Sequence, residues 1–276
     1  MVGSYFLMCE GRKPRTSLSN SCPGSPCTGV TDCSFVASLC VTAALDQRFK
    51  KCLITPIVYP QCPAGKMVYN PQGKYIVKLW LNGCARQIVV DDRYVLFRLD
   101  MLSFVFFISS LLFLTPFCAI DKIRLPIDKH GNLLCAHTNC PSGQLELYVP
   151  IIEKAYLKMS GGYDFPGSNS GVDLFALTGW IPERILFPKH PPNVRDFETE
   201  PERAWERLMS AHSFGDCLIS MSSDADVTDE EADRMGLVTG HAYAVLNVVQ
   251  TRSGTRLLML KNPWCSKVSP YWSFQH

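Results

Sequence analysis

The chain has 276 residues, of which 47% are hydrophobic and 19% are charged. This length and composition exclude a disordered chain and a disulfide-stapled miniprotein. The 27 basic and 25 acidic residues leave a net charge of +2, so the charge balance predicts neither nucleic acid nor an anionic membrane as the main partner. The length is sufficient for one large domain or for two medium-sized lobes.

The chain is rich in cysteine, with 13 residues of this type. No secretory signal is predicted after Met1, because the apolar stretch at 5–9 is too short and no basic residue precedes it. The sequence contains no Asn-x-Ser/Thr sequon and no Cys-x-x-Cys pair of the kind that holds zinc. We therefore predict a cytoplasmic protein with reduced thiols, no disulfide framework and no metal site.

The first part of the chain predicts a leader, a helix and a hairpin, in that order. Residues 1–29 have no periodicity and are assigned to no element. Residues 35–45 are apolar on nearly every helical face, which predicts a fully buried helix with Asp32 as its N-cap. Residues 74–92 alternate around an Asn-Gly pair, which predicts a β-hairpin with a type I′ turn.

The rest of the chain predicts short helices and antiparallel strands. A helix is expected to begin at Pro150 and to end at a Gly-Gly pair, and residues 166–171, rich in Gly, Ser and Asn, predict a loop. The remaining predicted elements are two short helices that open with capping boxes at Thr199 and Thr228, a strand over 217–221, and strands over 242–249 and 256–260.

Three residues in this pattern form a candidate catalytic set. His241 begins one strand of the last hairpin and Asn262 ends the other, so an antiparallel pair brings both side chains to the same end, where Trp264 is expected to cover them. An Asn that accepts from one imidazole nitrogen fixes the tautomer and leaves the other nitrogen to take up a proton. Cys33 starts the buried helix, whose N-terminal partial charge favours a thiolate. The order Cys, His, Asn is that of papain-type amide hydrolysis, whereas the alternative interpretation is a buried structural cysteine and a structural histidine.

Five blocks of the sequence resemble active-site blocks of the calpain family of cysteine proteases. They are the segments 32–39 (DCSFVASL), 152–156 (IEKAY), 161–170 (GGYDFPGSNS), 240–245 (GHAYAV) and 260–264 (LKNPW). Ser34 stands where most calpains carry Trp, and this residue and the third block resemble the PalB-type branch of the family. The resemblance covers roughly residues 30–93 and 125–264.

The resemblance implies an α+β fold of the papain-like type, with two lobes and a cleft between them. The first lobe, over residues 30–180, is expected to be helical and to carry the nucleophile helix. The second lobe, over residues 181–276, is expected to be rich in antiparallel β-structure and to carry the His and the Asn. The family's second lobe continues well beyond the Asn-Pro-Trp motif, and residues 265–276 do not resemble that continuation. The second lobe is therefore expected to be truncated.

The resemblance also implies a role for each site residue. Cys33 matches the nucleophile of the family, His241 its general base and acid, and Asn262 the residue that orients the imidazole. Gly167 and Ser168 fall in the loop that lines the cleft and contacts the substrate backbone.

Two departures from the family pattern matter for function. Cys27 stands where the family has a Gln whose side-chain amide helps to hold the oxyanion, and one lost donor of this kind costs about 3–4 kcal/mol in comparable hydrolases. Residues 94–124 separate segments that are adjacent in the family, and they include the twenty uncharged residues 101–120, which are long enough to span a membrane. Three interpretations of this insert are open, in this order: a translated non-coding segment, an interaction insert, and a membrane span.

The predicted function is that of an intracellular calpain-type cysteine endopeptidase, which hydrolyses protein substrates through a Cys-His-Asn triad and an acyl-enzyme. The alternative is a catalytically inactive calpain-like module that binds proteins, which the missing Gln, the insert and the truncation favour. A membrane-anchored protein that uses residues 101–120 is a third alternative. The sequence shows no required cofactor and no EF-hand loop, so calcium enters only through the family resemblance.

Overall fold

The computed structural model of the chain describes residues 3–9, 32–93, 135–136, 147–162, 165–186, 201–223, 228–234, 236–263 and 272–274. The elements of the first lobe are α1 (Cys33–Phe49), the 3-10 turn Thr55–Ile57, β2 (Val58–Tyr59), β3 (Lys74–Leu81), β4 (Cys84–Asp91), α3 (Tyr148–Met159) and α4 (Ser170–Thr178). The elements of the second lobe are β1 (Gly3–Cys9), β5 (Glu183–Leu186), α5 (Pro201–Phe214), β6 (Cys217–Ser223), α6 (Asp229–Arg234), β7 (Ala242–Gln250), β8 (Arg256–Lys261) and β9 (Trp272–Phe274).

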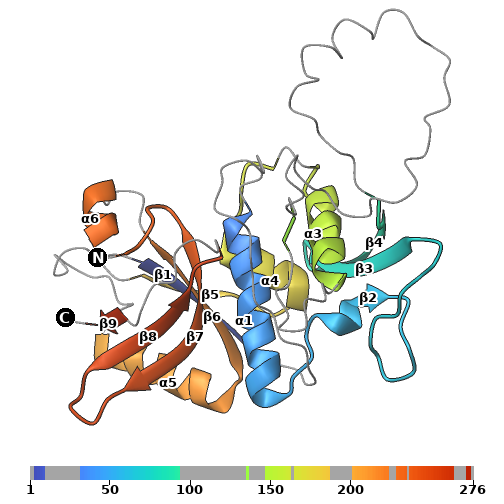
Figure 1. Cartoon of the computed structure of the whole chain (residues 1–276). Coiled ribbons are helices and arrows are strands. Elements are labelled where there is room, and N and C mark those ends of the chain that lie inside the picture. Colours follow the sequence, from blue (N-terminus) through green and yellow to red (C-terminus); the bar gives the residue numbers. More distant parts are fainter. Residues whose placement is uncertain are drawn as a thin grey trace, which may run out of the picture.

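The strands form two antiparallel sheets, one in each lobe. The smaller sheet has the order β2-β3-β4 and the larger one the order β5-β1-β6-β7-β8-β9. Helices α3 and α4 pack on the smaller sheet, α5 packs on β6 and β7, and α1 lies between the two lobes (Figure 1). This arrangement confirms the predicted α+β class, with a mainly helical first lobe and an antiparallel sheet in the second.

Helix α1 is buried along most of its length because apolar cores lie on two sides of it. Phe35 and Leu39 pack into the core of the first lobe. Val41 and Leu45 pack into a second core, which α1 shares with α4 and with strands β6 and β7. A helix that is apolar on every face needs such an enclosed position. The predicted buried helix is therefore confirmed, and its position between the lobes explains its composition.

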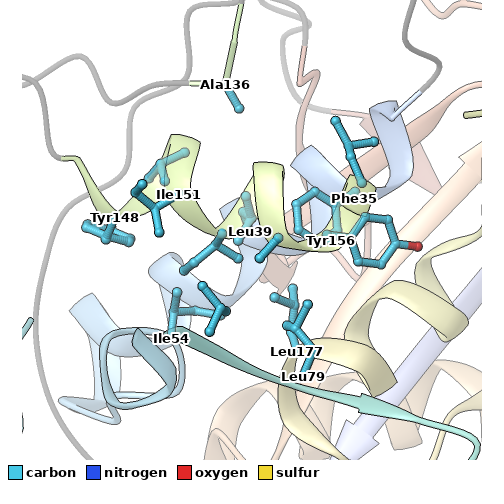
Figure 2. Close-up of a cluster of buried hydrophobic side chains, with 14 of the residues drawn as sticks. Phe35, Leu39, Ile54, Leu79, Ala136, Tyr148, Ile151, Tyr156 and Leu177 are labelled. Atoms are coloured by element: carbon cyan, nitrogen blue, oxygen red, sulfur yellow. The ribbon is translucent and has the colours of Figure 1, made fainter. Parts of the chain in front are cut away.

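The core of the first lobe holds the start of α1 against α3. Phe35 of α1 stacks on Tyr156 of α3, with ring centroids 4.0 Å apart and an angle of 17° between the planes. Leu79 of β3 and Leu177 of α4 close this cluster from the other side (Figure 2). Truncation of a buried aromatic side chain such as Phe35 costs about 3–5 kcal/mol. The same contacts that stabilise the lobe therefore fix Cys33, two residues before Phe35.

Strands β3 and β4 form the predicted hairpin, with Leu81 paired to Cys84 at its end. Asn82 and Gly83 have φ angles of 50° and 76°, and a type I′ turn requires positive φ at both central positions. The predicted turn is therefore confirmed.

Strand β1 lies in a stretch for which the sequence predicts no element. It is placed between β5 and β6 in the larger sheet, with Ser4 opposite Leu186 and Gly3 opposite Ser223. The prediction of a leader without regular structure is thus wrong for residues 3–9. Local pattern did not reveal this strand, because both of its partners belong to the second half of the chain.

Several predicted boundaries agree with the structure and others shift by two residues. Strands β6, β7 and β8 begin where the sequence predicts. Helix α6 follows directly after Thr228, the predicted capping position. Helix α3 begins at Tyr148, two residues before Pro150, because proline is tolerated in a first turn that needs no donor from it. Helix α5 begins at Pro201, and Thr199 lies outside the described residues.

Candidate active site

Cys33 is the first residue of α1 and lies at the boundary between the two lobes. Its side chain is half-buried, and the backbone amide of Ala242, at the start of β7, hydrogen-bonds to its sulfur. Ala242 directly follows His241, and α1 packs against β7 along this boundary. The structure therefore places the candidate nucleophile of the first lobe beside the segment of the second lobe that carries the candidate base.

His241 and Asn262 meet across the β7–β8 hairpin. His241 precedes β7 and Asn262 follows β8, and the strands pair Ala244 with Lys261 between them. Nε2 of the imidazole lies 2.8 Å from Oδ1 of Asn262. Because a carboxamide oxygen only accepts, Nε2 carries the proton and Nδ1 becomes the nitrogen that can take up another one. Both side chains are buried, with 2% and 6% of their surface exposed.

Burial disfavours charge on both candidate catalytic groups. It raises the pKa of the Cys33 thiol, and the charges of nearby carboxylates add to this, while the backbone amide of Ala242 opposes it. Burial also lowers the pKa of His241. The hydrogen bond to Asn262 has the opposite, smaller effect. The surroundings therefore favour a neutral thiol and a neutral imidazole over an ion pair.

The carboxyl groups of Asp32 and Glu153 form a pair next to Cys33. Asp32 occupies the N-cap position of α1 without making a capping hydrogen bond, and its carboxyl group hydrogen-bonds to Glu153 of α3 instead. Glu153 also accepts from the backbone N–H of Ala136 at 3.0 and 3.1 Å. Burial and the charge of Asp32 raise the pKa of Glu153 well above its usual range, so the pair shares a proton. The predicted N-cap position of Asp32 is thus confirmed, but its side chain makes no capping bond because it hydrogen-bonds to Glu153 of α3.

Gly167 and Ser168 lie in the loop before α4, next to the groups that surround Cys33. Gly167 has a φ of 103°, a conformation that favours glycine. Ser168 is exposed, and its side chain hydrogen-bonds to the buried Asp173 of α4. Asp173 also accepts from the hydroxyl of Tyr156, and its charge acts on Cys33. The loop predicted to contact substrate is therefore on the nucleophile side of the site.

Sequence reasoning missed α4 and the carboxylate that it carries. The helix starts at Ser170, inside the segment predicted as a loop, and Asn169 caps it by accepting from the N–H of Val172 at 3.1 Å. Burial raises the pKa of Asp173 to about 6, although hydrogen bonds from neighbouring hydroxyl groups act to lower it. A usable signal was present, because Asp173 is the single charged residue in the apolar run 172–177.

Three predictions concern residues that lie outside the described ones. They are the exchange of the oxyanion Gln for Cys27, the insert 94–124, and the cover that Trp264 provides. Among the helices that the structure describes, none combines the length and the apolar character needed to cross a bilayer. Residues 101–120 belong to the insert, so the membrane-span interpretation stays a prediction.

The described ranges contain no group of three or more His, Cys, Asp or Glu side chains arranged to hold a metal ion. The sequence is acidic over residues 222–233, and the structure describes this stretch only in part. Calcium dependence thus stays a prediction from the family resemblance, and no chemical step proposed below uses calcium.

Comparisons with known proteins point to one family. A family profile described as "Calpain family cysteine protease" matches residues 118–275. The chain is 44% identical over 238 residues to Calpain-7 of Homo sapiens, which is 86% of this chain and 24% of that protein. It is 34% identical over 235 residues to the calpain-like protease palB/RIM13 of Aspergillus oryzae, covering 85% of this chain and 22% of that protein. The calpain-like protease palB of Emericella nidulans is 34% identical over 245 residues, 88% of this chain and 24% of that protein.

The chain belongs to the calpain family of cysteine proteases and has its papain-like α+β fold, because the family profile matches more than half of it. The similarity to Calpain-7 and to palB confirms the predicted PalB-type branch. The chain spans about a quarter of the length of these relatives. His241 and Asn262 fall inside the matched residues, and Cys33 precedes them.

The family match corrects one prediction about the end of the chain. It continues past Trp264 to residue 275, so the expectation that residues 265–276 do not resemble the family is wrong. These residues include β9, which extends the larger sheet by pairing with β8. Strand β9 lies at the edge of the sheet and contains no active-site motif, so the sequence motifs did not reveal it. The predicted lobe limits at 180 and 181 and the predicted truncation of the second lobe stay predictions.

Proposed function

We propose that this chain carries the catalytic core of a calpain-type cysteine endopeptidase, with Cys33 as nucleophile, His241 as general base and acid, and Asn262 as the group that orients the imidazole. One observation carries the proposal: Nε2 of His241 lies 2.8 Å from Asn262, in the same segment whose backbone amide contacts the sulfur of Cys33. Membership of the calpain family supports the reaction class.

In the proposed reaction, the thiol proton passes to Nδ1 of His241 while the sulfur attacks the carbonyl carbon of a peptide bond. The backbone N–H of Cys33, at a helix N-terminus where such groups lack intrahelical partners, donates to the oxyanion. The tetrahedral intermediate then collapses to a thioester, and the amine leaves with the proton from His241. Water, deprotonated by the same imidazole, hydrolyses the thioester and regenerates the thiol.

The substrates of this core are proposed to be proteins that present an extended backbone to the site. The link from Ser168 through Asp173 to the surroundings of Cys33 supports such a contact by the loop with Gly167 and Ser168. A glycine at positive φ leaves the backbone of this loop free of a side chain that would obstruct an approaching chain.

The competing proposal is a calpain-like module that binds proteins without cleaving them. Cys27 at the position of the oxyanion Gln supports it, since one lost donor costs about 3–4 kcal/mol in comparable hydrolases. The high pKa of the Cys33 thiol also supports it, because little thiolate is then present at neutral pH. The two proposals differ in whether bound protein is turned over.

Replacement of the nucleophile decides between them. We expect Cys33→Ala to lower the turnover of a denatured casein-type substrate by at least about 1000-fold, as the loss of a catalytic nucleophile does in comparable hydrolases. The thermal melt should be unchanged, because only a half-buried thiol at a helix start is lost. Cys84→Ala removes an exposed free thiol and serves as the matched control, with full turnover expected.

Full turnover by Cys33→Ala would disprove the nucleophile assignment. A wild-type chain that binds the casein substrate and never cleaves it would instead establish the binding module.

A further inference from the structure

The backbone of His241 is held by Ser223, the last residue of β6. The N–H of Ser223 donates to the carbonyl oxygen of His241 at 2.9 Å, and its Oγ accepts from the N–H of His241 at 2.9 Å. The same hydroxyl donates to the carbonyl oxygen of Val238 at 2.5 Å, with the carbonyl oxygen of His241 as a second acceptor at 3.2 Å. One serine therefore bonds both backbone polar groups of His241.

Tyr243, the second residue of β7, holds the same segment from the other side. It is fully buried, and its hydroxyl accepts from the N–H of Val238 at 2.7 Å. Its ring is perpendicular to the imidazole of His241, with centroids 5.0 Å apart and 88° between the planes. This edge-to-face contact is the favoured geometry for such rings, so Tyr243 restrains the imidazole as well as the backbone before it.

We call Ser223 and Tyr243 the His241 clamp. The sheet pairing between β6 and β7 reaches from Ser220–Ala244 to Ser222–Ala242, and His241 itself lies before β7. Between the two clamped residues, Val238 and His241, the chain turns through Gly240 at a φ of 58°. The position of the imidazole thus depends on the hydrogen bonds of the clamp as well as on the sheet.

We propose that Ser223 and Tyr243 are positioning residues for proton transfer by His241, acting through its backbone and its ring. The proposal rests on the function proposed above for His241. A misplacement of about 1 Å at a catalytic group costs on the order of 100-fold in rate. Because the contacts described for the clamp are with Val238 and His241, we expect its loss to lower kcat and to leave KM nearly unchanged.

The test compares hydroxyl removal at two positions of the same strand. Ser223→Ala is expected to lower kcat by about 10- to 100-fold and to change KM by less than about threefold. Ser223→Thr keeps the hydroxyl and should restore most of the loss. Ser220→Ala is the matched control, because Ser220 is fully buried on β6 and its Oγ has no hydrogen-bond partner among the described residues. Its kcat should equal that of the wild type.

Tyr243→Phe provides a second variant that keeps the ring contact and removes the acceptor of the Val238 N–H. We expect a smaller loss of kcat than for Ser223→Ala, because only one backbone group of the segment loses its partner. If Ser223→Ala does not fold, Tyr243→Phe decides the question with the same measurements.

NMR of the labelled His241 imidazole, recorded on chains that carry Cys33→Ala, gives a readout that does not depend on turnover. Ser223→Ala should shift or broaden the ring nitrogen signals of His241, and Ser220→Ala should not. The clamp is disproved if Ser223→Ala matches Ser220→Ala in kcat and in this spectrum, or if Ser223→Thr is no better than Ser223→Ala. A wild-type chain without turnover would disprove the proposed function. The spectra would still test whether Ser223 positions the imidazole of His241.

Discussion

The two halves of the candidate active site differ in charge. On the side of the first lobe, carboxyl groups lie around the start of α1: Asp32, Glu153 and Asp173. On the side of the second lobe, the partners of His241 described above are uncharged at neutral pH: Ser223, Tyr243 and Asn262. The thiol therefore sits in an acidic half, and the imidazole sits in a neutral, hydrogen-bonded half.

This difference bears on how the candidate nucleophile Cys33 would be activated. Burial, with a smaller contribution from the carboxylates, raises the pKa of Cys33, so the thiol does not ionise readily by itself. Burial lowers the pKa of His241, so the imidazole is neutral and ready to accept a proton at neutral pH. We infer general-base activation of a neutral thiol, in which the neutral half supplies orientation and the acidic half adds to the effect of burial on the thiol pKa.

The largest expected effect comes from breaking the neutral half. His241→Ala should lower kcat at least about 1000-fold, because it removes the proton acceptor. Asn262→Ala should lower kcat by about 10- to 100-fold, because the imidazole keeps its chemistry and loses its orientation. His212→Ala is the control, since His212 contacts Arg48 and Leu246 away from this hairpin end. Steady-state kinetics that show Asn262→Ala as damaging as His241→Ala would contradict the division of roles.

The hairpins and the meeting of His241 with Asn262 could be predicted from sequence because their signals are local. The Asn82-Gly83 turn fixes the register of β3 and β4, and an antiparallel hairpin necessarily brings His241 and Asn262 to one end. The apolar stretch at 35–45 also predicted burial correctly, although it did not show that two lobes enclose the helix.

The acidic half could not be predicted because it is assembled from distant segments. Asp32, Glu153 and Asp173 belong to three helices or helix starts, and none of them has a spacing pattern that marks a carboxylate cluster. Strand β1 was missed for a similar reason, because its pairing depends on β5 and β6. Both the carboxylate cluster and the pairing of β1 depend on long-range packing, whereas local sequence patterns predict only the individual helices and strands.

A substitution in the acidic half tests how its charge acts on the thiol. Asp173→Asn removes a negative charge that acts on Cys33 and keeps an acceptor for the Tyr156 hydroxyl. We expect the pKa of the Cys33 thiol to fall, so that its alkylation by iodoacetamide rises at lower pH than in the wild type. The measurement is the rate of Cys33 modification against pH by mass spectrometry. An unchanged or higher midpoint would mean that the charge of Asp173 does not raise the thiol pKa.

The same variant should alter stability in a pH-dependent way. The pKa of Asp173 is raised from 3.8 to about 6, so the folded chain binds this proton more tightly than the unfolded chain does. Stability from the protonated carboxyl is present below about pH 4 and is lost as the pH rises through about 6. Asp173→Asn should therefore be more stable than the wild type at pH 7.5, by up to about 3 kcal/mol, with the gain vanishing near pH 4.

Thermal melts at the two pH values measure this difference. Asp173→Ala also removes the acceptor of Tyr156 and should be destabilised at both. A gain for Asp173→Asn that is equal at both pH values would contradict the raised pKa.

Selective labelling of Cys33 by a peptide-like electrophile tests the central claim most directly, because it requires both halves of the site to act together. Cys62, whose pKa is lowered by backbone hydrogen bonds, and the exposed Cys84 are free thiols that serve as internal references. Mass spectrometry should show Cys33 modified faster than either reference, and His241→Ala should abolish that preference. Labelling of Cys33 no faster than that of Cys62 or of Cys84, or a preference that survives His241→Ala, would contradict a cysteine protease site built from Cys33 and His241.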